Sequence, residues 1–392
     1  EAFAGGETRT ITIDGVQYTV KNKLTTANDL SYSKDTSTGE LTLIASNFEI
    51  RGQSDVAHNL IISGKSNSIY GGKLDDKVEE SDSENCYINY IYGGEGNDTI
   101  ILRATASVGY GEAGDDLLTA YTGSLNGGTG EDIFNIYAGY VVHHGGAGND
   151  IFNIYGVSNK IYGDDGDDIF NILQGGSNTI DGGTGTNTVT GTVGTNTTIN
   201  VIGANSGSVS LTKGVEQVVN INGIDYTMST ESTTATVIYS INDSGQITFS
   251  MSSNQAIIRG DLNKKHNVSI KAGITFYGGN KGDIIDAHGA TIYLGSGNNT
   301  LKAFGTTIYG SSGNDTVSIT DGSFFYGGTG ITNLTARSLN YIESVSGTMN
   351  LSLYGDNNTV YGTGGNNTLV SNTRPNNFIS GFGDADNAQA LS

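Results

Sequence analysis

Residues 145–172 read GGAGNDIFNIYGVSNKIYGDDGDDIFNI and contain one pattern twice. Glycines and an acid precede an isoleucine and a phenylalanine, so that Asp150-Ile151-Phe152 returns as Asp168-Ile169-Phe170 after 18 residues. A helix would not tolerate this density of glycine, and the apolar residues alternate with polar ones as they do in a strand. A coil of two short strands and two turns fits the interval, and such coils stack at the inter-strand spacing of ~4.8 Å. The sequence therefore predicts an all-β fold, a right-handed parallel β-roll or β-solenoid.

The same pattern continues on both sides of this segment, over residues 92–190. Its aspartates are spaced by 16 or 18 residues and are Asp98, Asp116, Asp132, Asp150 and Asp168. Because equivalent residues of stacked coils lie above one another, we expect a buried ladder of Phe134, Phe152 and Phe170. The other half of each coil has no second glycine and acid motif, so we expect the motif to mark one edge of the stack only.

A longer repeat relates the two halves of the chain. ITIDGVQYTV near the start is echoed by VNINGIDYTM, with Gly15 matching Gly223 after 208 residues. Asp-Gly and Asn-Gly in these segments predict hairpins with type I′ turns. We interpret the repeat as two homologous tandem modules. Their predicted parts are a metal-free segment that caps module 1 (1–65), the first β-roll (66–212), a metal-free cap of module 2 (213–272) and a looser second β-roll with a cap-like C-terminal tail (273–392).

The composition narrows the range of partners. The 392 residues include 19 basic and 40 acidic ones, which gives a formal net charge of −21. That sign argues against nucleic acid and anionic membrane surfaces and favours cations. No stretch approaches the ~18 apolar residues of a membrane span. The single cysteine, Cys86, cannot form an internal disulfide.

The glycine-rich turn predicts a metal site. Glycine allows positive φ and the close approach of other groups, so several carbonyl oxygens of one turn can point at one place. Carbonyl and carboxylate oxygens without sulfur or imidazole are typical ligands of a hard cation, and six to eight of them at about 2.3–2.6 Å suit Ca²⁺ better than Mg²⁺. We therefore predict several Ca²⁺ ions along this edge. The predicted ligands are Gly94, Gly96, Asp98, Gly111, Ala113, Asp115, Asp116, Gly128, Gly130, Asp132, Gly146, Gly148, Asp150, Asp165, Asp167, Asp168, Asp283 and Asp315.

These motifs carry a resemblance. YGGEGNDTI (92–100), GGTGEDIFN (127–135) and GGAGNDIFN (145–153) resemble the nonapeptide GGxGxDxUx of the repeats-in-toxin (RTX) proteins. The resemblance implies Ca²⁺ between the turns of a parallel β-roll, export by a type I secretion system and an extracellular or bacterial cell-surface location. The tail at 377–386 is similar to the segment that follows such arrays.

The sequence also departs from the RTX pattern. Tandem arrays of that family carry the motif every nine residues, whereas here it recurs every 16 or 18. Asn187, Asn299, Thr332 and Asn367 replace the acid, so we expect weak or no metal binding at those levels. Leu74 replaces a glycine, which puts a site at Asp76 in doubt.

Three functions compete. The sequence contains no HExxH, GxSxG or CxxC motif, and we expect no enzymatic activity. The favoured function is a calcium-stiffened structural or interaction region of a secreted or surface protein, such as an adhesin, a surface-layer component or a toxin repeat region. Its expected partners are calcium and a cell-surface glycan, a lipopolysaccharide or like chains. The alternative is a polysaccharide-modifying enzyme or its accessory carbohydrate-binding module. Ice binding is disfavoured because the third motif position varies too much.

The simplest alternative needs no ligand at all. Glycine, asparagine and aspartate populate the turns of any β-solenoid without binding metal. Likewise, the tyrosines that precede the glycines, such as Tyr92 and Tyr110, form either a packing ladder or a sugar-binding face.

Overall fold

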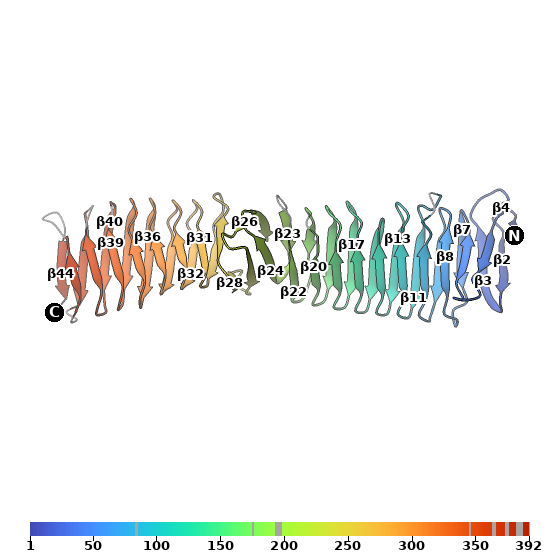
Figure 1. Ribbon diagram of the computed structural model, residues 1–392, viewed down its shortest axis with the longest axis horizontal. Coiled ribbons are helices and arrows are strands. Elements are labelled where there is room, and N and C mark those ends of the chain that lie inside the picture. The colour runs from blue at the N-terminus through green and yellow to red at the C-terminus, as the bar shows by residue number, and fades with distance from the viewer. Residues whose placement is uncertain are drawn as a thin grey trace. The chain divides into compact units, whose positions relative to one another are not determined.

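The fold is a parallel β-solenoid, as predicted. The computed structural model describes residues 1–82, 85–174, 176–192, 198–344, 346–362, 366–372, 376–381 and 387–391, and every regular element in them is a strand (Figure 1). Contacts divide the chain into two compact units, 1–204 and 205–392. Each unit consists of two sheets, and each coil of the chain adds one parallel strand to each sheet, while the strands at the start of each unit pair antiparallel.

In the first unit the two sheets alternate along the chain. One sheet contains β7 (Phe48–Gly52), β9 (Ser68–Gly72), β11 (Tyr90–Glu95), β13 (Val108–Ala113), β15 (Ser124–Thr129), β17 (Val142–Ala147), β19 (Lys160–Asp165), β21 (Thr179–Asp181) and β23 (Thr198–Ile202). The other contains β6 (Leu41–Ile44), β8 (Asn59–Ser63), β10 (Lys77–Glu80), β12 (Thr99–Leu102), β14 (Leu117–Ala120), β16 (Ile133–Ile136), β18 (Ile151–Ile154), β20 (Ile169–Ile172) and β22 (Asn187–Thr192).

The second unit repeats this arrangement. One sheet contains β29 (Ala256–Gly260), β31 (Ile274–Tyr277), β33 (Thr291–Tyr293), β35 (Thr307–Tyr309), β37 (Phe324–Tyr326), β39 (Tyr341–Ser344), β41 (Thr359–Gly362) and β43 (Phe378–Ser380). The other contains β28 (Ile247–Ser253), β30 (Asn267–Ile270), β32 (Ile284–His288), β34 (Thr300–Phe304), β36 (Asn314–Thr320), β38 (Ile331–Ala336), β40 (Thr348–Leu353), β42 (Thr368–Asn372) and β44 (Asn387–Leu391). Of the cap-like tail, residues 382–386 lie outside the described residues.

The core of the first unit contains ladders of buried apolar side chains, one of which consists of three phenylalanines. Phe134, Phe152 and Phe170 are fully buried, and successive rings stack with centroids 4.4 and 4.8 Å apart. They lie opposite one another in the parallel pairing of β16, β18 and β20. The predicted phenylalanine ladder is thereby confirmed. Strand alternation produces it, because every second residue of a strand faces the interior.

An antiparallel hairpin precedes the parallel strands of one sheet in each unit. β2 (Thr8–Ile13) pairs with β3 (Val16–Asn22), and β25 (Gln217–Ile221) pairs with β26 (Ile224–Ser229). The turn residues Asp14 and Gly15 have φ of 48° and 83°, and Asn222 and Gly223 have 49° and 81°. Two positive values in succession define the type I′ turn, so this prediction is also confirmed.

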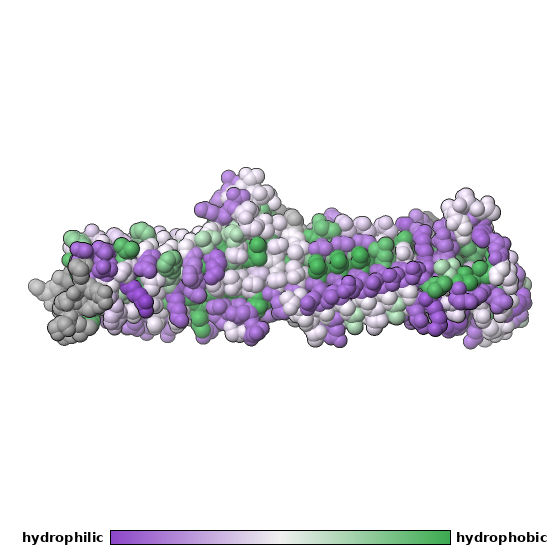
Figure 2. All heavy atoms as spheres, turned by 90° about the horizontal axis from the view of Figure 1, so that it is seen from below, coloured by the Kyte–Doolittle hydropathy of each residue, from purple (hydrophilic) through white to green (hydrophobic). Residues whose placement is uncertain are grey.

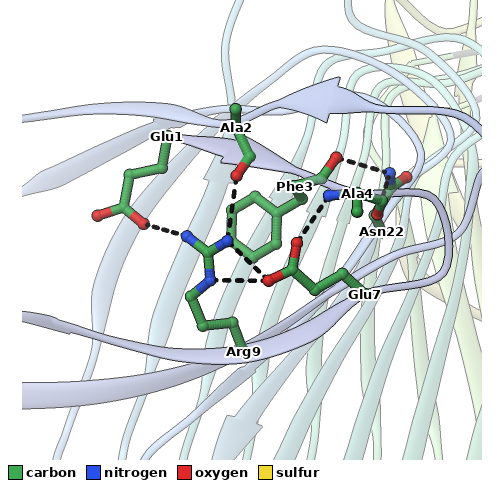
Figure 3. Close-up of polar contacts among 7 residues, drawn as sticks. All are labelled: Glu1, Ala2, Phe3, Ala4, Glu7, Arg9 and Asn22. Atoms are coloured by element: carbon green, nitrogen blue, oxygen red, sulfur yellow. Dashed lines mark hydrogen bonds and ion pairs between the residues drawn. The ribbon is translucent and has the colours of Figure 1, made fainter.

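The first residues of the chain pack on the hairpin of the first unit (Figure 3). The side chain of Arg9 donates to Glu7 Oε1 at 2.7 Å and to the carbonyl of Ala2 at 3.2 Å. Its guanidinium lies 4.7 Å from the ring centroid of Phe3, which is fully buried. The buried ring of Phe3, covered by the Arg9 and Glu7 pair, therefore caps this end of the solenoid, where the strand edges would otherwise be unpaired.

Matching contacts follow each hairpin. His58 Nδ1 lies 3.3 Å from the hydroxyl of Tyr18, and His266 Nδ1 lies 3.3 Å from that of Tyr226. Both histidines are buried and follow the hairpin at the same interval, since 58 and 266 differ by the 208 residues that separate Gly15 from Gly223. These contacts support the interpretation of two homologous modules, which stays an interpretation.

The type I′ turn gives a first testable prediction. Gly15→Ala should lower the free energy of unfolding by about 1–2 kcal/mol, because a side chain at φ of 83° is strained even where the surrounding space is open. Gly15→Asn is the matched control and should cost less, since asparagine tolerates this conformation. Urea denaturation measures both variants, and equal losses would contradict the assigned turn.

Candidate functional site: the aspartate ladder

Five aspartates form a buried row along one edge of the first unit. Each directly precedes a strand of the sheet that contains the phenylalanine ladder, so alternation directs Asp132 inward, Ile133 outward and Phe134 inward again. No member of the row is more than 2% exposed. We call this row the aspartate ladder: Asp98, Asp116, Asp132, Asp150 and Asp168.

One carboxylate oxygen of each ladder residue joins two coils. The backbone N–H of Asp98 donates to Oδ1 of Asp116 at 2.7 Å, and that of Asp116 donates to Oδ1 of Asp132 at 2.8 Å. Equivalent bonds link the remaining members of the ladder. The last bond of the series runs from the N–H of Asp168 to Oδ1 of Asn187 at 2.8 Å. Each side chain therefore satisfies a buried donor of the preceding coil.

The other carboxylate oxygen has no partner. Oδ2 of all five ladder residues is buried without a hydrogen bond. Asn187 shows what surrounds this place, because its Nδ2 donates to the carbonyls of Gly182 at 2.7 Å and Thr184 at 3.1 Å, the first and third residues of its turn. The surroundings thus offer acceptors. An amide fits there, whereas a bare carboxylate oxygen facing carbonyl oxygens is repelled.

The second residue of the turn decides whether a carbonyl or an N–H faces the carboxylate. In the ladder turns it has positive φ, for example 121° at Gly94 and 118° at Gly146. Gly72, at the same place before Asp76, lacks positive φ, and its N–H donates to Asp76 Oδ2 at 2.7 Å. A reversed φ at this residue accompanies rotation of the preceding peptide, as between turn types I and II, and we attribute the difference to that rotation.

The first glycine of each turn leaves room beside the unpaired oxygen. A Cβ on Gly111 would lie 2.0 Å from Asp116 Oδ2 and 2.5 Å from the carbonyl oxygen of Gly127 in the next coil. A Cβ would lie equally close, 2.0–2.2 Å from Oδ2 of the ladder aspartate of the same turn, on Gly93, Gly127, Gly145 and Gly163. The carboxylate of one coil and a carbonyl of the next therefore converge on one small space, which any side chain would fill.

Burial makes the ladder carboxylates weak acids. It raises the pKa of Asp98 and Asp116 to about 7 and that of Asp150 to about 8, with smaller opposing effects from the hydrogen bond to the preceding coil. The pKa of Asp132 and of Asp168 rises to about 6 for the same reason. Near neutral pH the ladder is therefore only partly ionised when no cation lies beside Oδ2.

Three other predicted acidic ligands lie apart from the ladder. Asp115, Asp165 and Asp167 are exposed at the outside of the turns. Asp115 Oδ1 accepts from the N–H of Glu131 at 2.8 Å, and Asp167 Oδ1 accepts from that of Thr186 at 2.6 Å. Asp165 Oδ1 accepts from Thr184 Oγ1 at 2.9 Å. These outer residues join neighbouring turns, and the sequence pattern alone did not separate them from the buried row.

The remaining predicted ligands supply backbone only. They lie in the turns that surround the ladder, where the third glycine of the motif has positive φ, 137° at Gly114 for instance. These predicted residues are Gly94, Gly96, Gly111, Ala113, Gly128, Gly130, Gly146 and Gly148.

In the second unit the two predicted acids have both oxygens paired. Asp283 accepts from the N–H groups of His266 at 2.9 Å and Gly279 at 2.8 Å. Asp315 accepts from the N–H and the side chain of Asn299 and, through Oδ2, from Ser311 Oγ at 3.2 Å. The unpaired oxygen that characterises the ladder is therefore missing at both, and metal binding at these two residues stays a prediction.

The opposite edge of the first unit carries an asparagine row that the sequence analysis missed. Asn67, Asn89, Asn159 and Asn178 are buried, and each Nδ2 donates to a carbonyl oxygen, that of Ala45 at 2.7 Å in the case of Asn67. A signal was present, since each of the four stands two residues before an isoleucine. Amides therefore donate to carbonyls at one edge, whereas the ionised carboxylates at the other edge have no hydrogen to donate.

The donor set is restricted to oxygen. Among the described residues, no three or more His, Cys, Asp or Glu side chains come together as a metal site. A cation at the ladder would therefore be held by one or two carboxylates and by backbone carbonyls. Such a set suits a hard cation.

Comparisons with known proteins assign no family. No protein-family model matches the chain, and no curated protein matches it either. No helix in the described part of the chain is long and apolar enough to cross a membrane.

Proposed function

We propose that the aspartate ladder of the first unit binds Ca²⁺ and that the protein is a calcium-stiffened structural or interaction region of a secreted or surface-attached bacterial protein. The observation that carries the proposal is the set of five buried Oδ2 atoms without a hydrogen bond, at a place where the amide of Asn187 donates to two carbonyls. The RTX resemblance of the turns supports the same ion and an extracellular location.

The binding residues follow from the geometry of the ladder. The carboxylates of Asp98, Asp116, Asp132, Asp150 and Asp168 would bind through Oδ2, together with carbonyls of the first and third turn residues. A bound cation supplies positive charge where the carboxylate and the carbonyls repel one another. Each ion would thus replace repulsion between neighbouring coils by attraction. The proposal does not include the levels of Asp76, Asn187, Asp283 and Asp315, because their side chains are paired.

The expected consequence is stiffness under extracellular conditions. Extracellular calcium modules have dissociation constants of about 10⁻⁴–10⁻³ M. At a tenfold excess over the dissociation constant, each site adds about 1.4 kcal/mol to the stability of the folded state. Five such sites would add an amount comparable with the whole stability of a domain. The proposal assigns no catalytic role to the chain.

Thermal unfolding tests the proposal directly. We expect the melting temperature at pH 7.5 to rise by about 10 °C or more in millimolar Ca²⁺ relative to EDTA, because the ions bind only the folded coils. Mg²⁺ at the same concentration should give a smaller rise, because it gives up its water ligands reluctantly. Equal melting temperatures in Ca²⁺ and EDTA would contradict calcium binding.

Counting the bound ions after dialysis locates the sites. Asp132→Asn should reduce the number of Ca²⁺ ions per chain, because the amide nitrogen occupies the place of Oδ2. Asp115→Asn removes the same charge from an exposed outer residue and should leave that number unchanged. The opposite result would place the ions at the outer residues.

A further inference from the structure

One outer face of the first unit exposes large apolar side chains, which point away from the core. Leu117, Ile133 and Ile169 are 39–40% exposed, and Tyr121 and Tyr137 are 44% and 43% exposed. Figure 2 shows an apolar band along the strands between β13 and β20, beside a hydrophilic band. Exposed patches of this kind mark interaction sites.

The face consists of three parallel rows on β14, β16, β18 and β20. An aliphatic row begins the strands, an amide row lies at their middle, and an aromatic row directly follows them. We call these twelve residues the outer face: Leu117, Ile133, Ile151 and Ile169; Thr119, Asn135, Asn153 and Asn171; Tyr121, Tyr137, Tyr155 and Leu173.

The outer face has no charge. None of its twelve residues is ionised at neutral pH, although the chain as a whole has a net charge of −21. Arg103 lies over the ring of Tyr121 at the N-terminal end of the aromatic row, but its guanidinium is paired with Glu79 at 2.8 Å. A cationic partner would prefer the acidic turns, so the occupant of this face is a neutral one.

Three consecutive coils carry the same group in the amide row and in the aromatic row, apart from Thr119 and Leu173 at the ends. Asn153 donates to Asn135 at 3.1 Å, and Asn171 donates to Asn153 at 3.1 Å, so one N–H of each donor amide is used within the row. An amide has two N–H groups and two lone pairs, so each half-buried asparagine keeps hydrogen-bonding capacity for a partner. The tyrosine rings stack on one another with centroids 4.5–4.9 Å apart, which leaves their edges and hydroxyls to meet the occupant.

A periodic face matches a periodic partner. The repeat along the rows is the inter-strand spacing of ~4.8 Å, close to the length of one sugar in an extended chain of pyranose rings. The aliphatic row would contact the C–H groups of the sugars, and the amides and phenols would bond to their hydroxyls. A second copy of the chain would bring an equal charge of −21 to the contact, which disfavours self-association.

We propose that the outer face binds a neutral, extended polysaccharide that runs along the three rows. The proposal names a partner for the interaction role proposed above and rests on that role, but none of its contacts involves a cation. A finding that the protein does not bind calcium would therefore not contradict polysaccharide binding, provided that the first unit is folded.

Co-sedimentation with microcrystalline cellulose and with chitin tests the proposal, in Ca²⁺ at a temperature where the chain is folded. We expect retention on at least one of the two polymers. Asn153→Asp places a charge in the amide row and should weaken retention about tenfold or more, because the charge loses water without gaining a partner. Ile169→Lys, at an exposed position, should do the same.

The second unit offers a matched control. Asn350 donates to Asn333 at 2.9 Å in a similar amide pair, outside the outer face. Asn350→Asp should therefore leave retention unchanged. No retention by the folded chain, or equal loss for Asn153→Asp and Asn350→Asp, would overturn the proposal. So would a dimer in sedimentation velocity that Asn153→Asp dissociates, because the face would then join two copies. If calcium does not change the melting temperature but the chain is still retained on the polysaccharide, only the cation proposal is refuted.

Discussion

Replacing Asp116, Asp132 and Asp150 together by asparagine is expected to stabilise the protein in EDTA and to remove most of its response to calcium. Asn187 shows why. Its Oδ1 keeps the bond to the preceding coil, and its Nδ2 donates to two turn carbonyls, whereas Oδ2 of a ladder carboxylate has no hydrogen bond at this place. A buried unpaired polar group costs about 1–3 kcal/mol, so each replacement should recover an amount of that order at neutral pH. Urea denaturation in EDTA and in Ca²⁺ measures both effects.

At Asp76, one coil before the ladder, replacement by asparagine should have the opposite effect on stability in EDTA. Asp76 Oδ2 accepts an N–H from Gly72, so Asp76→Asn would direct an amide nitrogen at a donor and should destabilise the protein. Its calcium response should persist. Destabilisation by the triple variant in EDTA would show that the ladder oxygens are not directed at acceptors, and it would remove the main argument for a cation.

In EDTA the stability of the first unit should fall as the pH rises from about 4 to 8. The folded-state pKa values of the ladder lie between about 6 and about 8, above the unfolded value of about 3.9. Between these values the folded state binds more protons than the unfolded state, so the contribution of the ladder is complete below pH 4 and is lost as the pH passes the folded values. A shift of one pKa unit in a single group already corresponds to about 1.4 kcal/mol, so we expect the loss to be measurable by urea denaturation.

Calcium should reverse this dependence. Protons and Ca²⁺ compete for the same oxygens, so the stabilisation by Ca²⁺ should grow as the ladder ionises. Denaturation curves at pH 5 and pH 8, each with EDTA and with Ca²⁺, separate the two effects. Burial lowers the pKa of His143 to about 4, so this group opposes the trend between pH 4 and 6.5, but it is one group against five aspartates. Stability in EDTA that is higher at pH 8 than at pH 5 would contradict the buried ladder.

The repeat made much of the fold predictable from the sequence. In a solenoid a contact between neighbouring coils relates equivalent residues, so an interval of 18 residues predicted the stacking of Phe134 on Phe152. The same argument predicted that the ladder aspartates share one edge. The hairpin turns were predictable because Asp-Gly and Asn-Gly suit two successive positive φ values.

The pairing of individual oxygens was not predictable from the motif. Asp76 and Asp283 follow turns that resemble the ladder turns, yet both accept a bond from the N–H of the second turn residue. That difference depends on the orientation of one peptide. The separation of the exposed Asp115 from the buried Asp116 depends on which of two adjacent residues the strand turns inward.

The bonds along the aspartate ladder all run one way. The acceptor for a buried N–H of each coil comes from the coil that follows it in the chain, as Asp116 supplies it for Asp98. A coil is therefore complete only when its C-terminal neighbour is in place, whereas loss of its N-terminal neighbour leaves this donor satisfied. The side-chain bonds of this edge therefore have a polarity, opposite to that of the adjacent backbone bonds, in which the N–H of Leu117, for example, donates to the carbonyl of Asp98 in the preceding coil at 2.8 Å.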